Sequence, residues 1–132
     1  MTTDPVQSRT QGSPSMKPIM VVESLWRTPR KPMTPAQEKE YNHWCNEIHI
    51  PDLLQGTGMV SVTRYKNQDG SGYLWIQEFE SQAALEKYLV SERRKELIRE
   101  TESHYPGGVD PTNYFEKRSV RNFSWVAGQQ KR

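Results

Sequence analysis

Residues 59–80, MVSVTRYKNQDGSGYLWIQEFE, decide the fold because they read as two strands joined by a short loop. Residues 59–66 and 73–80 alternate side chains between two faces, which is the period of a half-buried strand. The intervening residues 67–72 contain two glycines, which readily adopt the positive φ angles of hairpin turns. The sequence therefore predicts an antiparallel hairpin in the middle of the chain.

A strand and a helix precede this hairpin. Residues 19–27, IMVVESLWR, are rich in β-branched and apolar side chains and favour a strand. Thr34 and Gln37 form a capping-box pattern with a proline at the first helical position, so a helix is expected to begin there. Pro51 lacks an N–H group and disfavours the helical conformation of the residue before it. The helix is therefore expected to end near residue 48 or 49.

A second helical region and a last strand follow the hairpin. Ser81 is expected to cap a helix, with a possible restart at Ser91. The helix has an apolar face made of Ala84, Leu85, Tyr88 and Leu89. Residues 101–113 contain two prolines and two glycines and predict a long loop, and residues 114–126 predict the last strand.

The order β-α-β-β-α-β predicts an α+β, ferredoxin-like fold, in which one antiparallel sheet carries both helices on one face. The other face of the sheet would then be bare. Five aromatic residues exceed what two helices are expected to cover: Trp26, Tyr73, Trp75, Phe123 and Trp125. We therefore expect a second copy of the chain to cover the bare face by two-fold symmetry, giving a homodimer.

The 132 residues suffice for one domain, which we expect to span residues 19–126. Residues 1–18 and 127–132 are polar and are expected to be disordered tails. The net charge of +2 comes from interleaved acidic and basic residues, which does not favour a nucleic-acid partner. Neither a signal peptide nor a membrane span is recognisable, and the single Cys45 fits a reducing compartment, so we expect a cytoplasmic protein.

Chemistry is most plausible in residues 40–52, EYNHWCNEIHIPD. The apolar stripe expected on this helix consists of Tyr41, Trp44, Cys45 and Ile48, and His49 lies at its edge. The helix dipole there favours the imidazolium, whereas burial favours the neutral ring. His49 is therefore either an acid/base group or a histidine that caps the helix carbonyls.

Two charged residues in the hairpin are further candidates. Glu78 shares a strand face with Leu74 and Ile76, so it is either a second acid/base group that orients His49 or the partner of an arginine, Arg64 or Arg118. Arg64 either binds a substrate carboxylate or enolate, or is an ordinary arginine at a strand end.

The remaining reactive residue types favour structural roles. His43 and His104 are expected at the surface, and Cys45 is expected to be inert packing. The spacing of His43, Glu47 and His49 does not fit a metal site, and no phosphate-binding glycine loop is present. The sequence therefore predicts no metal and no cofactor.

Three segments together resemble the EthD-like branch of the dimeric α+β barrel superfamily. They are the pattern Tyr41-x-x-Trp44-x-x-x-x-His49-x-Pro51, GMVSVTRY at 58–65 and YLWIQEFE at 73–80. The resemblance covers roughly residues 19–126. It implies a face-to-face homodimer, a pocket between each sheet and its own helices, and Tyr41, Trp44 and His49 as pocket residues.

The superfamily includes polyketide cyclases, muconolactone isomerases, cofactor-free quinone-forming monooxygenases and haem-degrading enzymes. We therefore expect an enzyme that cyclises, isomerises, dehydrates or decarboxylates a small aromatic or polyketide-like molecule without a cofactor. His49 and Glu78 would be catalytic, and Tyr41, Trp44 and Arg64 would bind the substrate. The alternatives are a cofactor-free or haem-dependent monooxygenase and a non-catalytic ligand-binding or accessory dimer.

Overall fold

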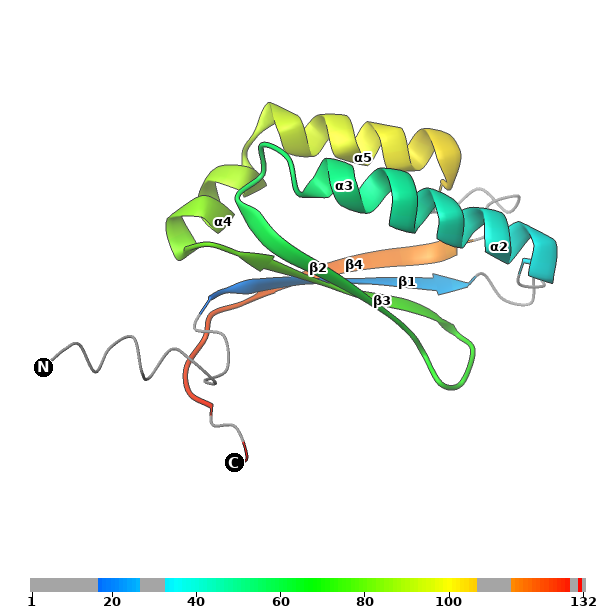
Figure 1. Cartoon of the computed structure of the whole chain (residues 1–132), viewed down its shortest axis with the longest axis horizontal. Helices are drawn as coiled ribbons and strands as arrows, with labels where there is room; N and C mark the ends of the chain where they lie inside the picture. The colour runs from blue at the N-terminus through cyan, green and yellow to red at the C-terminus, as the bar shows by residue number, and fades with distance from the viewer. Residues whose placement is uncertain (1–16, 27–32, 107–114, 129–130, 132) are drawn as a thin grey trace, which may run out of the picture.

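The computed structural model describes residues 17–26, 33–106, 115–128 and 131. A four-stranded sheet lies beneath a layer of helices (Figure 1). The strands are β1 (Ile19–Trp26), β2 (Met59–Lys66), β3 (Gly72–Phe79) and β4 (Phe115–Phe123). The helical elements are α2 (Pro35–Trp44), the π-helical turn η1 (Cys45–His49), α3 (Ile50–Leu53), α4 (Gln82–Leu89) and α5 (Glu92–His104).

The strand order is β2-β3-β1-β4, and all three pairings are antiparallel. Both outer strands thus flank the β1–β3 pair, and the helices cover one face (Figure 1). This arrangement confirms the predicted ferredoxin-like α+β fold. The expected tails fall largely outside the described residues.

The first helix begins as the capping box predicts. The Thr34 hydroxyl accepts a hydrogen bond from the Gln37 backbone N–H at 3.2 Å, and the Thr34 N–H donates to the Gln37 side chain at 2.9 Å. Two N–H groups that lack helical partners are thereby satisfied.

The predicted end of this helix is wrong, because the chain stays helical through Pro51 to Leu53. In an α-helix the Pro51 ring would clash with a carbonyl one turn earlier. Here η1 intervenes, and the Ile50 N–H bonds to the carbonyl of Cys45, five residues back. Pro51 then lies in the first turn of α3, where a missing N–H costs nothing.

The π turn also changes which side chains are buried. Its wider turn rotates the following residues about the helix axis relative to a regular α-helix. Ile48, expected on the apolar stripe, is 44% exposed, whereas His49 is only 8% exposed. The π turn therefore places the histidine, instead of the isoleucine, inside the protein.

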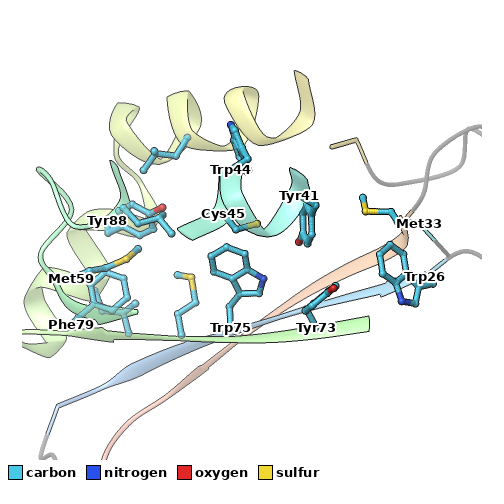
Figure 2. Close-up of a cluster of buried hydrophobic side chains, with 14 residues drawn as sticks. Trp26, Met33, Tyr41, Trp44, Cys45, Met59, Tyr73, Trp75, Phe79 and Tyr88 are labelled. Atoms are coloured by element: carbon cyan, nitrogen blue, oxygen red, sulfur yellow. The ribbon is translucent and has the colours of Figure 1, made fainter. Parts of the chain in front are cut away.

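The core lies between the sheet and the helices. Figure 2 shows aromatic side chains from β3 pointing toward side chains from the helices. Trp26, Tyr73 and Trp75 are buried in this layer, so the expectation that the helices could not cover them is wrong. Strand alternation places them on the face that the helices cover.

The opposite face of the sheet still carries apolar side chains. Alternation and register place Ile19, Val21, Tyr65, Leu74, Ile76 and Phe123 there. Phe123 is 43% exposed and Tyr65 54% exposed. The protomer therefore has a partly apolar face that none of its described helices covers.

The predicted long loop at 101–113 is partly wrong, because α5 continues through Thr101 to His104. Residues 107–114 lie outside the described part of the chain. The apolar side of α5, which carries Leu97, extends to Thr101 one turn later, so the last turns of the helix reach the interior. The glycines and prolines of this segment all lie after residue 105, so they did not argue against a helix at 101–104.

Candidate functional site

A cavity of about 240 Å³ lies between the sheet and the helices. Apolar and aromatic side chains make most of its wall: Met20, Val22, Tyr41, Trp44, Cys45, Leu53, Trp75, Tyr88, Leu97, Ile98 and Val120. The polar and charged lining residues are Ser24, His49, Gln77, Arg94, Thr101 and Glu102. An apolar chamber with a few polar groups is the usual form of a small-molecule site.

His49 lies between two tryptophans at this cavity. Its ring stacks on Trp44 with centroids 4.8 Å apart and an interplanar angle of 12°. The ring also lies edge-on to Trp75, with centroids 5.7 Å apart. Aromatic contacts on two sides hold the imidazole in a defined orientation.

Thr101 indicates which nitrogen of His49 carries the proton. The Thr101 hydroxyl donates to the Leu97 carbonyl at 2.9 Å and lies 3.4 Å from His49 Nε2. Because the single hydroxyl proton is used by Leu97, this contact is a hydrogen bond only if Nε2 is the donor.

Tyr41 and Trp44, the other two residues that the resemblance implies for a pocket, line the same cavity as His49. Tyr41 packs edge-on against Tyr105, with centroids 4.8 Å apart. Trp44 also stacks on His104 at 5.0 Å. Since Trp44 contacts His49 directly, it supports the imidazole as well as lining the cavity.

Ser24 and Gln77 are cavity residues that the sequence analysis missed. Ser24 is 3% exposed and Gln77 is 6% exposed. Among the described residues, neither side chain makes a hydrogen bond. The signal was present in the sequence, because strand alternation places each on the same face as apolar neighbours.

Arg64 does not line the cavity that contains His49. It lies in a separate, more open groove of about 640 Å³ between α2 and β2. Its guanidinium donates to the side-chain oxygens of Asn46 at 2.9 Å and Asn42 at 3.0 Å. The cation also lies over the Trp75 ring, 4.7 Å from its centroid. In this position Arg64 ties the helix to the sheet behind the cavity wall.

Glu78 likewise lies apart from His49. Its neighbour Gln77 points to the cavity, and alternation sends Glu78 to the opposite face of the sheet. There it accepts a hydrogen bond from the Ser61 hydroxyl at 3.2 Å. The proposed pairing with Arg64 is absent, because that arginine lies on the helix-covered face, and the Arg118 side chain lies outside the described residues. Glu78 therefore cannot orient His49 within this protomer.

The groove around Arg64 contains one ionic cluster. Glu38 binds Lys66 at 2.9 Å and accepts a hydrogen bond from the Tyr73 hydroxyl. The hydrogen bonds from Lys66 and then Tyr73 lower the pKa of Glu38. Burial, followed by the hydrogen bond to Glu38, raises the pKa of Tyr73, so this hydroxyl stays protonated at neutral pH.

The remaining cysteine and histidines lie where the sequence predicts, buried for Cys45 and at the surface for His43 and His104. Cys45 is fully buried at the cavity wall, and His43 is exposed. His104 is exposed as expected, but it lies in α5 instead of a loop. In the part of the chain that the structure describes, no three His, Cys, Asp or Glu side chains gather as metal ligands. None of the described helices has the length and apolar character to cross a bilayer.

Comparison with known proteins shows likeness in structure but not in sequence. No family model matches the chain, and no curated protein matches it. A monooxygenase from the gene ActVA-Orf6 of Streptomyces coelicolor, solved with nanaomycin D, is 14% identical, with a TM-score of 0.62. The match covers 89% of this chain and 94% of that chain.

Two further solved structures are similar. SnoaB, a cofactor-independent oxygenase from Streptomyces nogalater, is 13% identical over 88% of this chain and 97% of its own, with a TM-score of 0.53. An antibiotic biosynthesis monooxygenase is 12% identical over 83% of this chain and 99% of its own, with a TM-score of 0.52. These likenesses show that the chain shares its ferredoxin-like α+β fold with these proteins, and at this identity they show the fold alone.

Proposed function

We propose that the cavity beside His49 is the active site of an enzyme that moves a proton on a small, flat organic molecule without a cofactor. The observation that carries the proposal is the placement of His49, a buried imidazole held between Trp44 and Trp75 at the wall of a mainly apolar cavity. A well-placed acid/base group contributes on the order of 10² to 10⁴ in rate.

The chemistry follows from this environment. Neutral His49 would take a proton from a phenol or from a carbon next to a carbonyl, leaving a phenolate or an enolate. Returning that proton to another carbon of the enolate completes an isomerisation. In a cyclisation the enolate carbon first bonds to a second carbonyl carbon of the same molecule, whose C=O π bond breaks, and the resulting alkoxide takes the proton. Tyr41 and Trp44 supply aromatic surface for a planar ring. Glu78 and Arg64, which lie outside the cavity, have no part in this step.

Cofactor-independent monooxygenation is a second candidate. The likeness to structures named as monooxygenases favours it, including one complexed with nanaomycin D. It would begin with the same proton removal, after which the anion reacts with O₂. A phenol and O₂ give a quinone and water in balance, so no external reductant is required.

One assay separates the two candidates. The protein would be incubated with naphthols and with enolisable aromatic ketones while dissolved O₂ and products are followed. Equimolar O₂ uptake and quinone formation would establish oxygenation, and rearranged product without O₂ uptake would establish proton transfer alone. A Soret band in the purified protein would indicate haem chemistry instead. Tight ligand binding with no product would favour a binding or accessory protein and contradict the proposal.

The assignment to the EthD-like branch is part of the same proposal. It is supported by the pattern of Tyr41, Trp44, His49 and Pro51, because the first three of these residues meet at the cavity and Pro51 follows the π turn that buries the histidine. The fold itself is shared more widely among dimeric α+β barrels, so the branch depends on this motif.

We also propose that a second copy covers the bare face of the sheet. The partly apolar character of that face supports it. Ile76→Lys would place a charge among these side chains and is expected to give a monomer, measured by light scattering after size-exclusion chromatography. Lys95→Glu on exposed α5 is the control and should leave the mass unchanged. A monomeric wild-type protein would contradict the proposal.

A further inference from the structure

We propose that Ser24 and Gln77 bind the two ends of the substrate, which carries a hydrogen-bonding group at each end of a flat apolar body. The inference deepens the proposed function, since it concerns the same cavity and depends on that cavity holding a ligand. It adds two specificity-determining residues on the sheet to the histidine on the helix.

Burial is the first argument. Ser24 and Gln77 are both more than nine-tenths buried, and both line the cavity. Neither side chain makes a hydrogen bond among the described residues. A hydroxyl and an amide at the cavity wall that are not used by the protein's own groups are available to a ligand.

The neighbours on the same strand face are the second argument. On β1 they are Val22 and Trp26, and on β3 they are Trp75 and Phe79. At the positions of Ser24 and Gln77, an apolar side chain would pack better against these neighbours, because the space between sheet and helices is a hydrophobic core. Two polar side chains in this layer are therefore expected to serve a ligand.

Register gives the spacing of the two groups. Ser24 pairs with Tyr73, and Gln77 lies four residues further along β3, so the two residues are about 14 Å apart along the strand direction. Between them lies the Val22–Trp75 pair, and the Trp75 ring contacts His49. The sheet side of the cavity, which we call its floor, therefore has a polar side chain at each end, Ser24 and Gln77, and apolar side chains between them.

This pattern fixes the class of ligand. A flat molecule laid along the floor would place its apolar body on Trp75 and near His49, with a hydroxyl or carbonyl at each end. Gln77 and Ser24 can each donate and accept, so both oxygen functions are accommodated. A ring system with polar groups at one end only would leave one of the two side chains without a partner.

The test uses two probes that differ by one hydroxyl, 2-naphthol and 2,6-dihydroxynaphthalene. Titration calorimetry on the wild-type protein is expected to show about fivefold tighter binding of the diol, the effect of one additional hydrogen bond. Gln77→Met keeps the side-chain volume and should remove this preference. Ser24→Ala should do the same, because either change leaves one polar end.

Thermal unfolding gives a second readout that a purely structural role would move in the opposite direction. Gln77→Met replaces an amide among apolar neighbours by an apolar side chain of similar volume, so its unfolding temperature without ligand should be no lower than that of the wild type. Ser61→Ala, whose hydroxyl lies on the other face of the sheet, is the control and should leave the ratio of the two affinities unchanged.

A Gln77→Met protein that unfolds at a lower temperature and keeps the preference for the diol would overturn the inference. If His49 variants lose turnover while the preference is unaffected by Gln77→Met, the inference fails and the proposed function stands. If neither probe binds the wild-type protein, both the inference and the proposed cavity site fail.

Discussion

His49→Gln is expected to lower kcat by a factor of about 10² to 10⁴ on the substrate that the product assay identifies, because glutamine cannot exchange a proton near neutral pH. The glutamine amide retains a donor that can reach Thr101, so the change should remove chemistry more than structure. Binding of 2-naphthol, measured by calorimetry, should change by less than tenfold. The loss would then lie in the chemical step.

His104→Gln is the matched control. His104 also stacks on Trp44, but it is exposed on α5 and does not line the cavity. Loss of its stacking is expected to cost about 1 kcal/mol of stability and to leave kcat unchanged. A folded His49→Gln protein with full activity would refute the acid/base mechanism, and equal losses in both variants would show that only support of Trp44 matters.

The fold was predictable from the sequence because its signals are local. The hairpin glycines, the Thr34–Gln37 capping box and strand alternation each depend on neighbouring residues, and the structure confirms them. Alternation also separates Gln77 from Glu78, although the sequence does not say which of the two faces the helices cover.

The site was less predictable because it depends on a helix irregularity. Proline usually ends a helix, so Pro51 predicts an end that is wrong here: the π turn η1 precedes Pro51, the helix continues to Leu53, and His49 is turned inward. The last turns of α5 were read as loop, so Thr101 was not expected beside His49. Arg64 and Glu78 were grouped with His49 because a charged residue in a strand is a candidate site residue. The sequence does not show which cavity or which face of the sheet such a side chain reaches.

The second large effect is expected for Gly72→Ala, which should destabilise the protein by about 3 kcal/mol or more. Gly72 opens β3 with φ of 153°, a conformation that side-chain-bearing residues rarely adopt. A Cβ atom built there would lie 2.0 Å from the backbone oxygen of Ser24. Because the opposing atom is backbone, the β1–β3 ladder would have to shift.

Gly70→Ala separates the two causes within the same hairpin. Gly70 has φ of 78°, but no atom lies within 4 Å of its added Cβ, so only backbone strain of about 1–2 kcal/mol is expected. Urea unfolding of both variants measures the difference. Equal losses would show that the strands adjust freely at Gly72. A much larger loss for Gly72→Ala would show that β1 and β3 are held rigidly at Ser24, where the cavity floor requires a fixed hydroxyl.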